Sequence, residues 1–332
     1  MEVRQLRALS RELVRELGLF APRCCSVALT PVEAHLLIEL EQGPQTNNRL
    51  AERLRVDKSN TSRPLQRLQQ RGLVERLTDS GDARCQPVAL TTDGQGWLQD
   101  LHQELDQRTA QMMALLDSQE QQALAHGLQL YLRGLRDLQA QQGFSLRRLA
   151  AHDDAALARV IRQVSDEYGL SGRAGFSAAD PQLDHLSRDY DVPRAAYWVV
   201  TDTQGSIVGG GGIAPLQNAT ADVCELQKMY LLPTARGRGL GRRLLRQALA
   251  FARQAGYQHC YLETTAVLGE ACALYRQHGF IQQPHALGHT GHCGCEIRML
   301  CALTDRSAPA TEGSSTVRHP TAKKPSACCG KD

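Results

Sequence analysis

Long apolar runs are missing from this chain of 332 residues, and so is a strong excess of charge. A membrane-spanning helix needs about 20 consecutive apolar residues. No stretch approaches that length, so we expect no membrane span. Residues 1–17 also lack the apolar core of a secretory signal peptide. The net charge is only +3, so affinity for nucleic acid must come from local basic patches.

Cysteines are present, 11 in all, but they do not form the pattern of a disulfide framework. They are scattered along a large chain without a signal peptide, so we expect them to be reduced and the protein to be cytoplasmic. Internal repeats are absent from the sequence. The length predicts two domains, and the hydrophobic content of 42% is enough for globular cores.

A glycine-rich turn organises the second half of the chain. Residues 231–245, LLPTARGRGLGRRLL, predict a strand, a turn and a helix. A helix N-terminus presents unpaired N–H groups and a partial positive charge, which attract phosphate, and glycine lets the backbone approach the anion. A turn that serves backbone geometry alone is the alternative. The stretch lacks the Lys-Ser/Thr ending of a P-loop and the later acidic residue of a dinucleotide fold.

The blocks around this turn resemble the GNAT acetyltransferase superfamily. The phosphate motif of that family, Gln/Arg-x-x-Gly-x-Gly/Ala, is matched by Arg236, Gly239 and Gly241. The Leu-Tyr…Gly-Phe signature of its later helix is matched by Leu274-Tyr275 and Gly279-Phe280.

The resemblance covers residues 144–303 and implies an α/β GNAT fold with a mixed, mostly antiparallel central sheet. It also implies acetyl-CoA as the cosubstrate. The residues implied to hold it belong to the strand end, the turn and the helix start: Leu231, Arg236, Gly237, Arg238, Gly239, Leu240, Gly241 and Arg242.

Acetyl transfer requires a neutral amine, although a free lysine-type amine has a pKa near 10.4. Glu225 is the candidate general base, acting directly or through water. It precedes Arg236 by eleven positions (236 − 225), where many GNAT enzymes place a basic glutamate. The alternative is an exposed strand glutamate, or one paired with Lys228.

The other catalytic candidates come from the resemblance. Tyr275 matches the general acid that protonates the departing thiolate, and its alternative is a core tyrosine. Backbone N–H near Leu231 is implied to polarise the thioester carbonyl. Glu263 closes the next strand, so it is a candidate to orient the acceptor or to share the role of base.

A cluster of histidines and cysteines follows this catalytic region. It comprises His285, His289, His292, Cys293 and Cys295, at spacings that metal ligands use. In the resembling proteins the same loop often carries Thr-Gly-His, matched by residues 290–292. We favour a loop on the acceptor side and expect no metal, with zinc as the alternative.

The first half of the chain predicts a helix-turn-helix followed by a hairpin. Residues 50–76 hold seven Lys or Arg and three Asp or Glu, a local excess of four (7 − 3). Thr30-Pro31 with Glu33 is typical of a helix start. A later helix, from about Lys58 to Arg71, contains Pro64, which costs about 3 kcal/mol or more inside a helix. We therefore expect a late start near Ser62 or a kink.

This order of elements resembles the MarR family of winged-helix regulators. The matching text is LTPVEAHLLIEL, LAERLRVDKSNTSRPLQRLQQRGLVERL and GDAR…VALTTDGQGWL. Asp82-x-Arg84 matches the wing tip, whose arginine commonly enters the minor groove. The resemblance implies a mainly α winged helix that binds double-stranded DNA, and a solvated basic face is the alternative. The residues expected at the DNA are Ser59, Asn60, Thr61, Arg63, Arg67 and Arg84.

Residues 96–141 predict helix with more apolar positions than a small winged core needs. In MarR-like proteins the terminal helices form a dimer, so we expect a homodimer that reads half-sites about 10 base pairs apart. The expected domains are 1–142, MarR-like, and 144–303, GNAT-like. Residues 304–332, rich in Ser, Thr, Pro, Ala and Lys, are expected to be a disordered tail.

The two resemblances predict a bifunctional protein. It would be a transcriptional regulator and an acetyl-CoA-dependent N-acetyltransferase that acts directly on an amine, either a small molecule or an amino acid. One alternative is a one-component transcription factor whose GNAT domain senses CoA or another ligand without turnover. Another is a protein lysine acetyltransferase. Glu225, Tyr275 and the intact glycine turn favour the enzyme.

Overall fold

The structure is a computed structural model of the chain and describes residues 2–21, 28–77, 86–171, 175–291 and 294–303. It divides into two compact units, Met1–Gly127 and Leu128–Asp332. This division falls within α6 (Ser118–Ala140). It therefore comes earlier than the boundary expected after residue 142.

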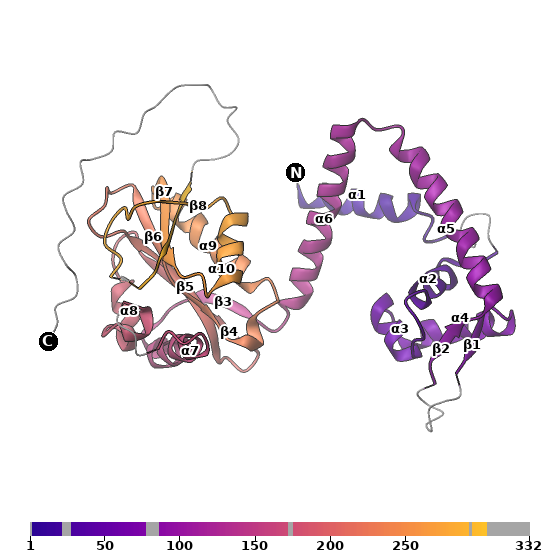
Figure 1. Cartoon of the computed structure of the whole chain (residues 1–332), viewed down its shortest axis with the longest axis horizontal. Coiled ribbons are helices and arrows are strands. Elements are labelled where there is room, and N and C mark those ends of the chain that lie inside the picture. The colour runs from indigo at the N-terminus through magenta and orange to yellow at the C-terminus, as the bar shows by residue number, and fades with distance from the viewer. Residues whose placement is uncertain (1, 22–27, 78–85, 172–174, 292–293, 304–332) are drawn as a thin grey trace. The chain divides into compact units, whose positions relative to one another are not determined.

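The N-terminal unit is helical, with one short hairpin (Figure 1). Its elements are α1 (Val3–Glu16), α2 (Pro31–Leu40), α3 (Asn47–Leu54), α4 (Lys58–Gln70), β1 (Val74–Arg76), β2 (Val88–Leu90) and α5 (Thr92–Met113). The order of helices and antiparallel hairpin expected for a winged helix is observed. Its core is built by buried leucines of α2, α3, α4 and α5, among them Leu36, Leu50, Leu68 and Leu101.

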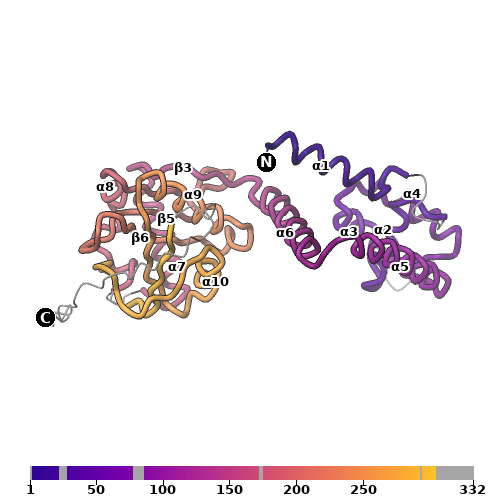
Figure 2. The backbone as a smooth tube through the Cα atoms, turned by 90° about the horizontal axis from the view of Figure 1, so that it is seen from above, coloured from indigo at the N-terminus to yellow at the C-terminus, as the bar shows by residue number. Residues whose placement is uncertain are grey.

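The helical region expected over residues 96–141 consists of two helices, α5 and α6, separated at residues 114–117 (Figure 2). α5 is capped by Thr91, whose hydroxyl accepts from the Gly94 N–H. α1 and α6 bury no residue, and leucines such as Leu115 and Leu138 remain exposed around them. Both helices therefore present exposed apolar side chains.

α4 begins at Lys58 and continues through Pro64, so the late start near Ser62 is not observed. Proline removes one backbone donor from the helix. The hydroxyls of Thr61 and Ser62 donate to the carbonyls of Lys58 and Ser59 in the turn before it. Pro64 itself is buried, and its packing offsets part of the lost hydrogen bond.

Thr30 and Glu33 form a capping box at the start of α2. The Glu33 carboxylate accepts from the Thr30 N–H at 2.8 Å, and its other oxygen accepts from Nε of Arg67 at 2.7 Å. Glu33 is buried, so this cap also ties α2 to α4.

Replacing Thr30 by alanine is therefore expected to lower the free energy of unfolding by about 1 kcal/mol, the usual cost of a lost N-cap. Urea unfolding followed by circular dichroism measures it. The matched control is Thr109→Ala, because Thr109 is at an exposed position of α5 and its hydroxyl donates to the Leu105 carbonyl of the same helix. Equal effects of the two substitutions would contradict the capping role.

The C-terminal unit is a seven-stranded sheet with helices on both faces (Figure 1). The strand order is β3-β4-β5-β6-β7-β9-β8, and every pair is antiparallel except β6 with β7. Its strands are β3 (Ser145–Arg148), β4 (Ala196–Thr201), β5 (Ile207–Pro215), β6 (Val223–Leu231), β7 (His259–Thr264), β8 (Ile281–Gln282) and β9 (Ile297–Ala302). Its other helices are α7 (Asp154–Glu167), α8 (Leu186–Asp189), α9 (Leu240–Gln254) and α10 (Gly269–Gln277). The mixed, mostly antiparallel sheet is thus confirmed.

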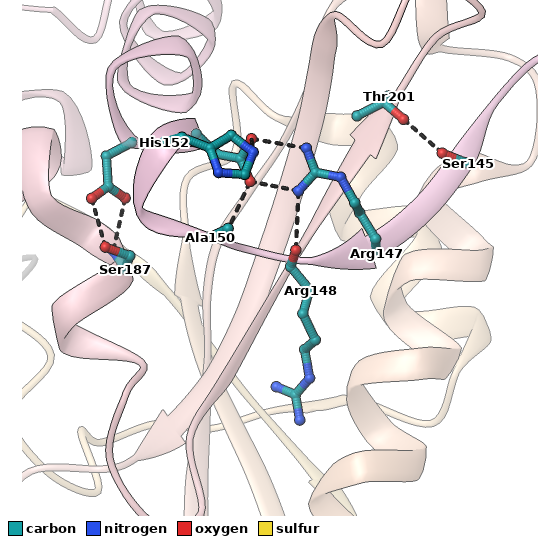
Figure 3. A network of polar contacts seen from close by, with 9 residues as sticks. Ser145, Arg147, Arg148, Ala150, His152, Ser187 and Thr201 are labelled. Atoms are coloured by element: carbon teal, nitrogen blue, oxygen red, sulfur yellow. Dashed lines mark hydrogen bonds and ion pairs between the residues drawn. The ribbon is translucent and has the colours of Figure 1, made fainter.

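Alternation along β4 shows which helix covers which face. Ala196 and Trp198 pack with α9, whereas Tyr197 and Val199 pack with α7. Successive strand residues point to opposite faces, so α7 and α9 lie on opposite sides of the sheet. Ahead of α7, Arg147 of β3 makes a bidentate ion pair with Asp153, and Ser187 at α8 donates to Asp154 (Figure 3).

The run Gly209–Gly212 lies in β5. Glycine is needed at two of these positions because tyrosine rings lie very close to the backbone there. A methyl group on Gly210 would fall 2.5 Å from the Tyr197 ring, and one on Gly212 would fall 2.7 Å from the Tyr190 ring. Glycine weakens a strand but leaves room for other groups. The two tyrosine rings, with centroids 5.0 Å apart, fill this space.

Candidate active site

The glycine-rich turn follows β6 and opens α9, as the sequence predicts. Gly237 and Gly239 have φ values of +70° and +73°, a left-handed conformation that glycine adopts without strain. Gly239 is the N-cap, and Leu240 is the first residue of α9. The N–H groups of the first helical turn therefore point towards the space in front of this turn.

A cleft of about 460 Å³ lies beside the turn. Six of the eight residues expected to hold acetyl-CoA line it, namely Leu231, Arg236, Gly237, Gly239, Leu240 and Gly241. The end of β6 and the start of α10 complete its wall through residues such as Met229 and Leu274. Donors at one end and apolar side chains along the wall fit a cosubstrate with phosphates and a long thiol arm.

The arginines of the turn have different partners. Arg236 makes a bidentate ion pair with Glu167 and donates from Nε to the Leu231 carbonyl, so it braces the turn against β6 and α7. Arg238 donates to the Thr234 carbonyl. Neither Arg238 nor Arg242 lines the cleft, among the residues the structure describes.

Arg242 pairs with a carboxylate of the chain itself. Its Nη1 lies 2.5 Å from Oδ2 of Asp137, near the end of α6. A methyl group on Gly239 would fall 2.6 Å from the other oxygen, Oδ1. An anionic side chain therefore sits at the N-terminus of α9, where the helix dipole favours negative charge.

β6 separates from β7 in the middle of the sheet. The parallel pairing covers only Val223–Glu225 against His259–Tyr261. On its other edge, β6 shifts register against β5 near Gly211, and Lys228 has a positive φ of +48°. This opening brings side chains from β6, β7 and α10 around one small cavity of about 60 Å³. Met229, Tyr230 and Leu268 line both this cavity and the cleft beside the turn.

Glu225 faces this small cavity and is only 2% exposed. Burial raises its pKa to about 7, although a hydrogen bond from Gln227 and the charge of Lys228 act in the opposite direction. The alternative of an exposed strand glutamate is therefore wrong. The ion-pair partner of Lys228 is Asp180, at 2.9 Å.

Tyr275 lines the same cavity as Glu225. It is also buried beside Phe280, and burial raises the pKa of its phenol, which keeps it protonated. Glu263 lines the cavity too, but Tyr261 and Thr290 each donate to its carboxylate at 2.6 Å. The structure thus brings the three catalytic candidates to one cavity. The Glu263 carboxylate accepts two hydrogen bonds from side chains, whereas the Glu225 carboxylate accepts one.

The sequence reasoning missed Tyr190, Gln227 and Asp180. Gln227 donates to Glu225 at 2.7 Å and accepts from the Tyr190 hydroxyl at 2.8 Å. The spacing of Glu225 and Gln227 by two residues, which puts both on one face of a strand, was a signal for the first contact. No local pattern pointed to Tyr190 or Asp180, which come from the loop-rich segment before β4.

The residues expected at DNA lie mainly on α4. Ser59, Asn60 and Arg63 are exposed. Arg67 is exposed as well, but its Nε is bound to Glu33. Thr61 is fully buried, and its hydroxyl donates to Asn47 of α3 at 2.6 Å, so it joins the two helices and does not face outward. Arg84 lies outside the described residues.

The histidine and cysteine cluster of residues 285–295 is described only in part, because positions 292 and 293 lie outside the described residues. Within the described residues, no three His, Cys, Asp or Glu side chains are arranged to hold a metal ion. His289 instead joins Gln217 in a backbone bridge.

The helices that the structure describes include none long and apolar enough to cross a membrane.

Comparisons with known proteins agree with both halves. The model of the acetyltransferase (GNAT) family matches residues 161–280, and that of the MarR family matches residues 29–84. The uncharacterized N-acetyltransferase YjgM of Escherichia coli K12 is 55% identical over 164 residues, which are 49% of this chain and 98% of that protein.

Two more distant similarities were found. Streptothricin acetyltransferase of Streptomyces lavendulae is 30% identical over 138 residues, 42% of this chain and 63% of that protein. The solved structure of a GNAT acetyltransferase of Staphylococcus aureus Mu50 is 17% identical, with a TM-score of 0.44, and the match covers 48% of this chain and 99% of that one.

Proposed function

This chain belongs to the GNAT family of acetyltransferases and also carries a MarR-family segment, and from that premise we propose that it acetylates a small amine and regulates transcription. It is an enzyme that uses acetyl-CoA. The observation that carries the proposal is a buried Glu225, with a pKa of about 7, facing one cavity together with Tyr275. A cytoplasmic location is part of the same proposal.

The proposed chemistry needs two proton transfers, and one residue of the cavity is proposed to carry out each of them. Acetyl-CoA, bound in the cleft beside the turn, supplies the thioester. Glu225 accepts a proton from the acceptor amine, directly or through one water, because a base with a pKa near working pH suits this step. Tyr275 donates a proton to the departing sulfur. Backbone N–H near Leu231 is proposed to polarise the thioester carbonyl, and Glu263 to orient the acceptor.

The volume of the small cavity limits what it holds. About 60 Å³ is the share of roughly two water molecules. Only the reacting amine fits there, so the rest of the acceptor must extend outside.

Release of CoA thiol from acetyl-CoA, measured with the full-length protein, tests the acceptor. The panel contains amino acids, polyamines and a lysine peptide. We expect turnover with a small amine and little with the peptide. Turnover with the peptide alone would overturn the small-molecule part, and tight binding of CoA with no turnover on any amine would favour a sensor.

The DNA-binding half of the proposal is supported by the MarR-family match and by the exposed residues Ser59, Asn60 and Arg63 of α4. Arg67 is proposed to act from its ion pair with Glu33, and Arg84 is proposed to act from the stretch of sequence between β1 and β2. The exposed leucines of α1 and α6 support a homodimer formed by the terminal helices.

Replacing Arg63 by alanine is expected to weaken binding of an operator duplex by about threefold to tenfold and to reduce the salt slope by about one. The measurement is fluorescence anisotropy over a series of salt concentrations. Arg159→Ala is the matched control, because Arg159 is an exposed arginine on α7, outside both α4 and the terminal helices. An unchanged affinity for Arg63→Ala would remove this residue from the interface.

The two activities are proposed to be coupled through Asp137. This carboxylate pairs with Arg242 beside Gly239, the place where a phosphate of the cosubstrate is expected. Binding of acetyl-CoA would compete with Asp137, and Asp137 belongs to α6, which begins at Ser118 in the MarR-like half. Unchanged DNA affinity with saturating acetyl-CoA and amine would remove the coupling.

A further inference from the structure

The cavity side chain proposed as the base is held by a chain of hydrogen bonds. Glu225 has one described donor on its carboxylate, Nε2 of Gln227, at 2.7 Å from Oε2. Gln227 in turn accepts at Oε1 from the hydroxyl of Tyr190, at 2.8 Å. Tyr190 caps the end of α8, outside the sheet. Three residues from two separate parts of the chain therefore form one line that ends at Glu225.

The direction of each hydrogen bond follows from the groups involved. An ionised carboxylate only accepts, so the NH2 group of Gln227 must face Glu225. Its carbonyl oxygen then faces Tyr190, whose hydroxyl has to be the donor. Burial raises the pKa of Tyr190 well above its ordinary value, so the phenol keeps its proton. With Glu225 ionised, only this orientation of the amide satisfies all three groups.

Gly212 makes this line possible. It is the cross-strand partner of Gln227 in the pairing of β5 with β6. A methyl group there would fall 2.7 Å from the Tyr190 ring and 2.5 Å from the Tyr197 ring. The ring of Tyr190 therefore occupies the place that a side chain opposite Gln227 would take, and reaches the amide from there.

We propose that Tyr190 and Gln227 are positioning residues of the acetyl transfer reaction: Tyr190 fixes the amide of Gln227, and this amide fixes the carboxylate of Glu225. One oxygen of Glu225 is then bound, and Oε1, to which no described residue donates, is left for the proton of the acceptor amine. The donated hydrogen bond favours the ionised carboxylate, which is the form that accepts a proton. The inference rests on the proposed role of Glu225 as base.

The test is the pH dependence of kcat/KM for Gln227→Leu and Tyr190→Phe, with acetyl-CoA and the best amine of the panel. For Gln227→Leu we expect the midpoint of the acid limb to move upward by about half a pH unit to one unit, which from a starting pKa of about 7 lowers kcat/KM at pH 7 by about twofold to fivefold. KM for acetyl-CoA should not change. Tyr190→Phe should move the midpoint in the same direction by less.

A double substitution shows whether Tyr190 acts through Gln227. If it does, Tyr190→Phe adds little to the effect of Gln227→Leu, since residues of one network are not additive. Tyr257→Phe is the control, because this buried hydroxyl donates to the Arg194 carbonyl and lines neither cavity. It should leave the midpoint in place. Thermal unfolding of each variant identifies loss of folding, and Tyr190→Phe retains the ring if Gln227→Leu does not fold.

Failure of this inference is distinct from failure of the proposed function. If Glu225→Gln loses the rate while Gln227→Leu and Tyr190→Phe leave the midpoint in place, the positioning role is overturned and the base remains. If Glu225→Gln keeps the wild-type rate and acid limb, the role of the base falls and this inference falls with it.

Discussion

Replacing Glu225 by glutamine is expected to lower kcat by about two to four orders of magnitude, which is the range for loss of a general base. The substitution keeps the shape of the side chain and removes the proton acceptor. Glu225 lines the small cavity but not the cleft beside the glycine turn, so the Kd of acetyl-CoA should remain within about twofold. Steady-state kinetics and isothermal titration calorimetry provide the two measurements.

Glu263→Gln is the matched comparison for this prediction. Its carboxylate lines the same cavity but is bound by Tyr261 and Thr290, so we expect a smaller loss of rate. A larger loss for Glu263→Gln than for Glu225→Gln would transfer the base role to Glu263. Wild-type activity should rise with pH through about 7, as the Glu225 carboxyl loses its proton.

The same substitution has a consequence for stability. The pKa of Glu225 is raised from 4.5 to about 7 in the folded protein. Between these values the folded state binds more protons than the unfolded state, so the stability of the wild type falls as pH rises through this window. Glu225→Gln removes this penalty, which is at most on the order of 3 kcal/mol. The inactive variant should therefore be at least as stable as the wild type at pH 8 in urea unfolding.

Much of the fold was predictable because its signals are local. Thr30 and the glycine turn each mark a helix start, and both helices begin there. The pattern of apolar residues also predicted the helical region 96–141, which is α5 and α6, and the strand before the turn, which is β6. Of the two expectations for Pro64, the late start of α4 is wrong, because propensity counts the lost donor of the proline but not the packing of its buried ring.

The site was predictable only where the motif is contiguous. The turn and Glu225 lie on one short stretch, so the sequence alone located them. Tyr190 and Asp180 lie in the loop-rich segment, and their contacts with Gln227 and Lys228 arise from the tertiary fold. The ion pair of Arg236 with Glu167 also arises from the tertiary fold, so the sequence of the turn did not predict it. Nor did the turn show that Arg242 binds a carboxylate of α6.

Replacing Asp137 by alanine is expected to tighten binding of acetyl-CoA by about tenfold at low salt. The carboxylate now pairs with Arg242 and lies at the N-terminus of α9, an arrangement worth about 1–2 kcal/mol that an incoming phosphate must replace. Isothermal titration calorimetry measures the change. The gain should shrink as salt screens the charges, and S-acetylpantetheine, which lacks the phosphates, should show none.

Asp106→Ala is the charge-matched control for this variant, because Asp106 is an exposed carboxylate on α5. It should leave the Kd of acetyl-CoA unchanged. If Asp137 also couples the two activities, Asp137→Ala without ligand should bind the operator with the affinity that the wild type shows when saturated with acetyl-CoA. Tighter binding of acetyl-CoA with no change in DNA affinity would leave Asp137 as a competitor for the turn alone. Unchanged or weaker binding of acetyl-CoA would mean that the phosphates and Asp137 do not share this place, because removing a competitor cannot weaken the ligand it competes with.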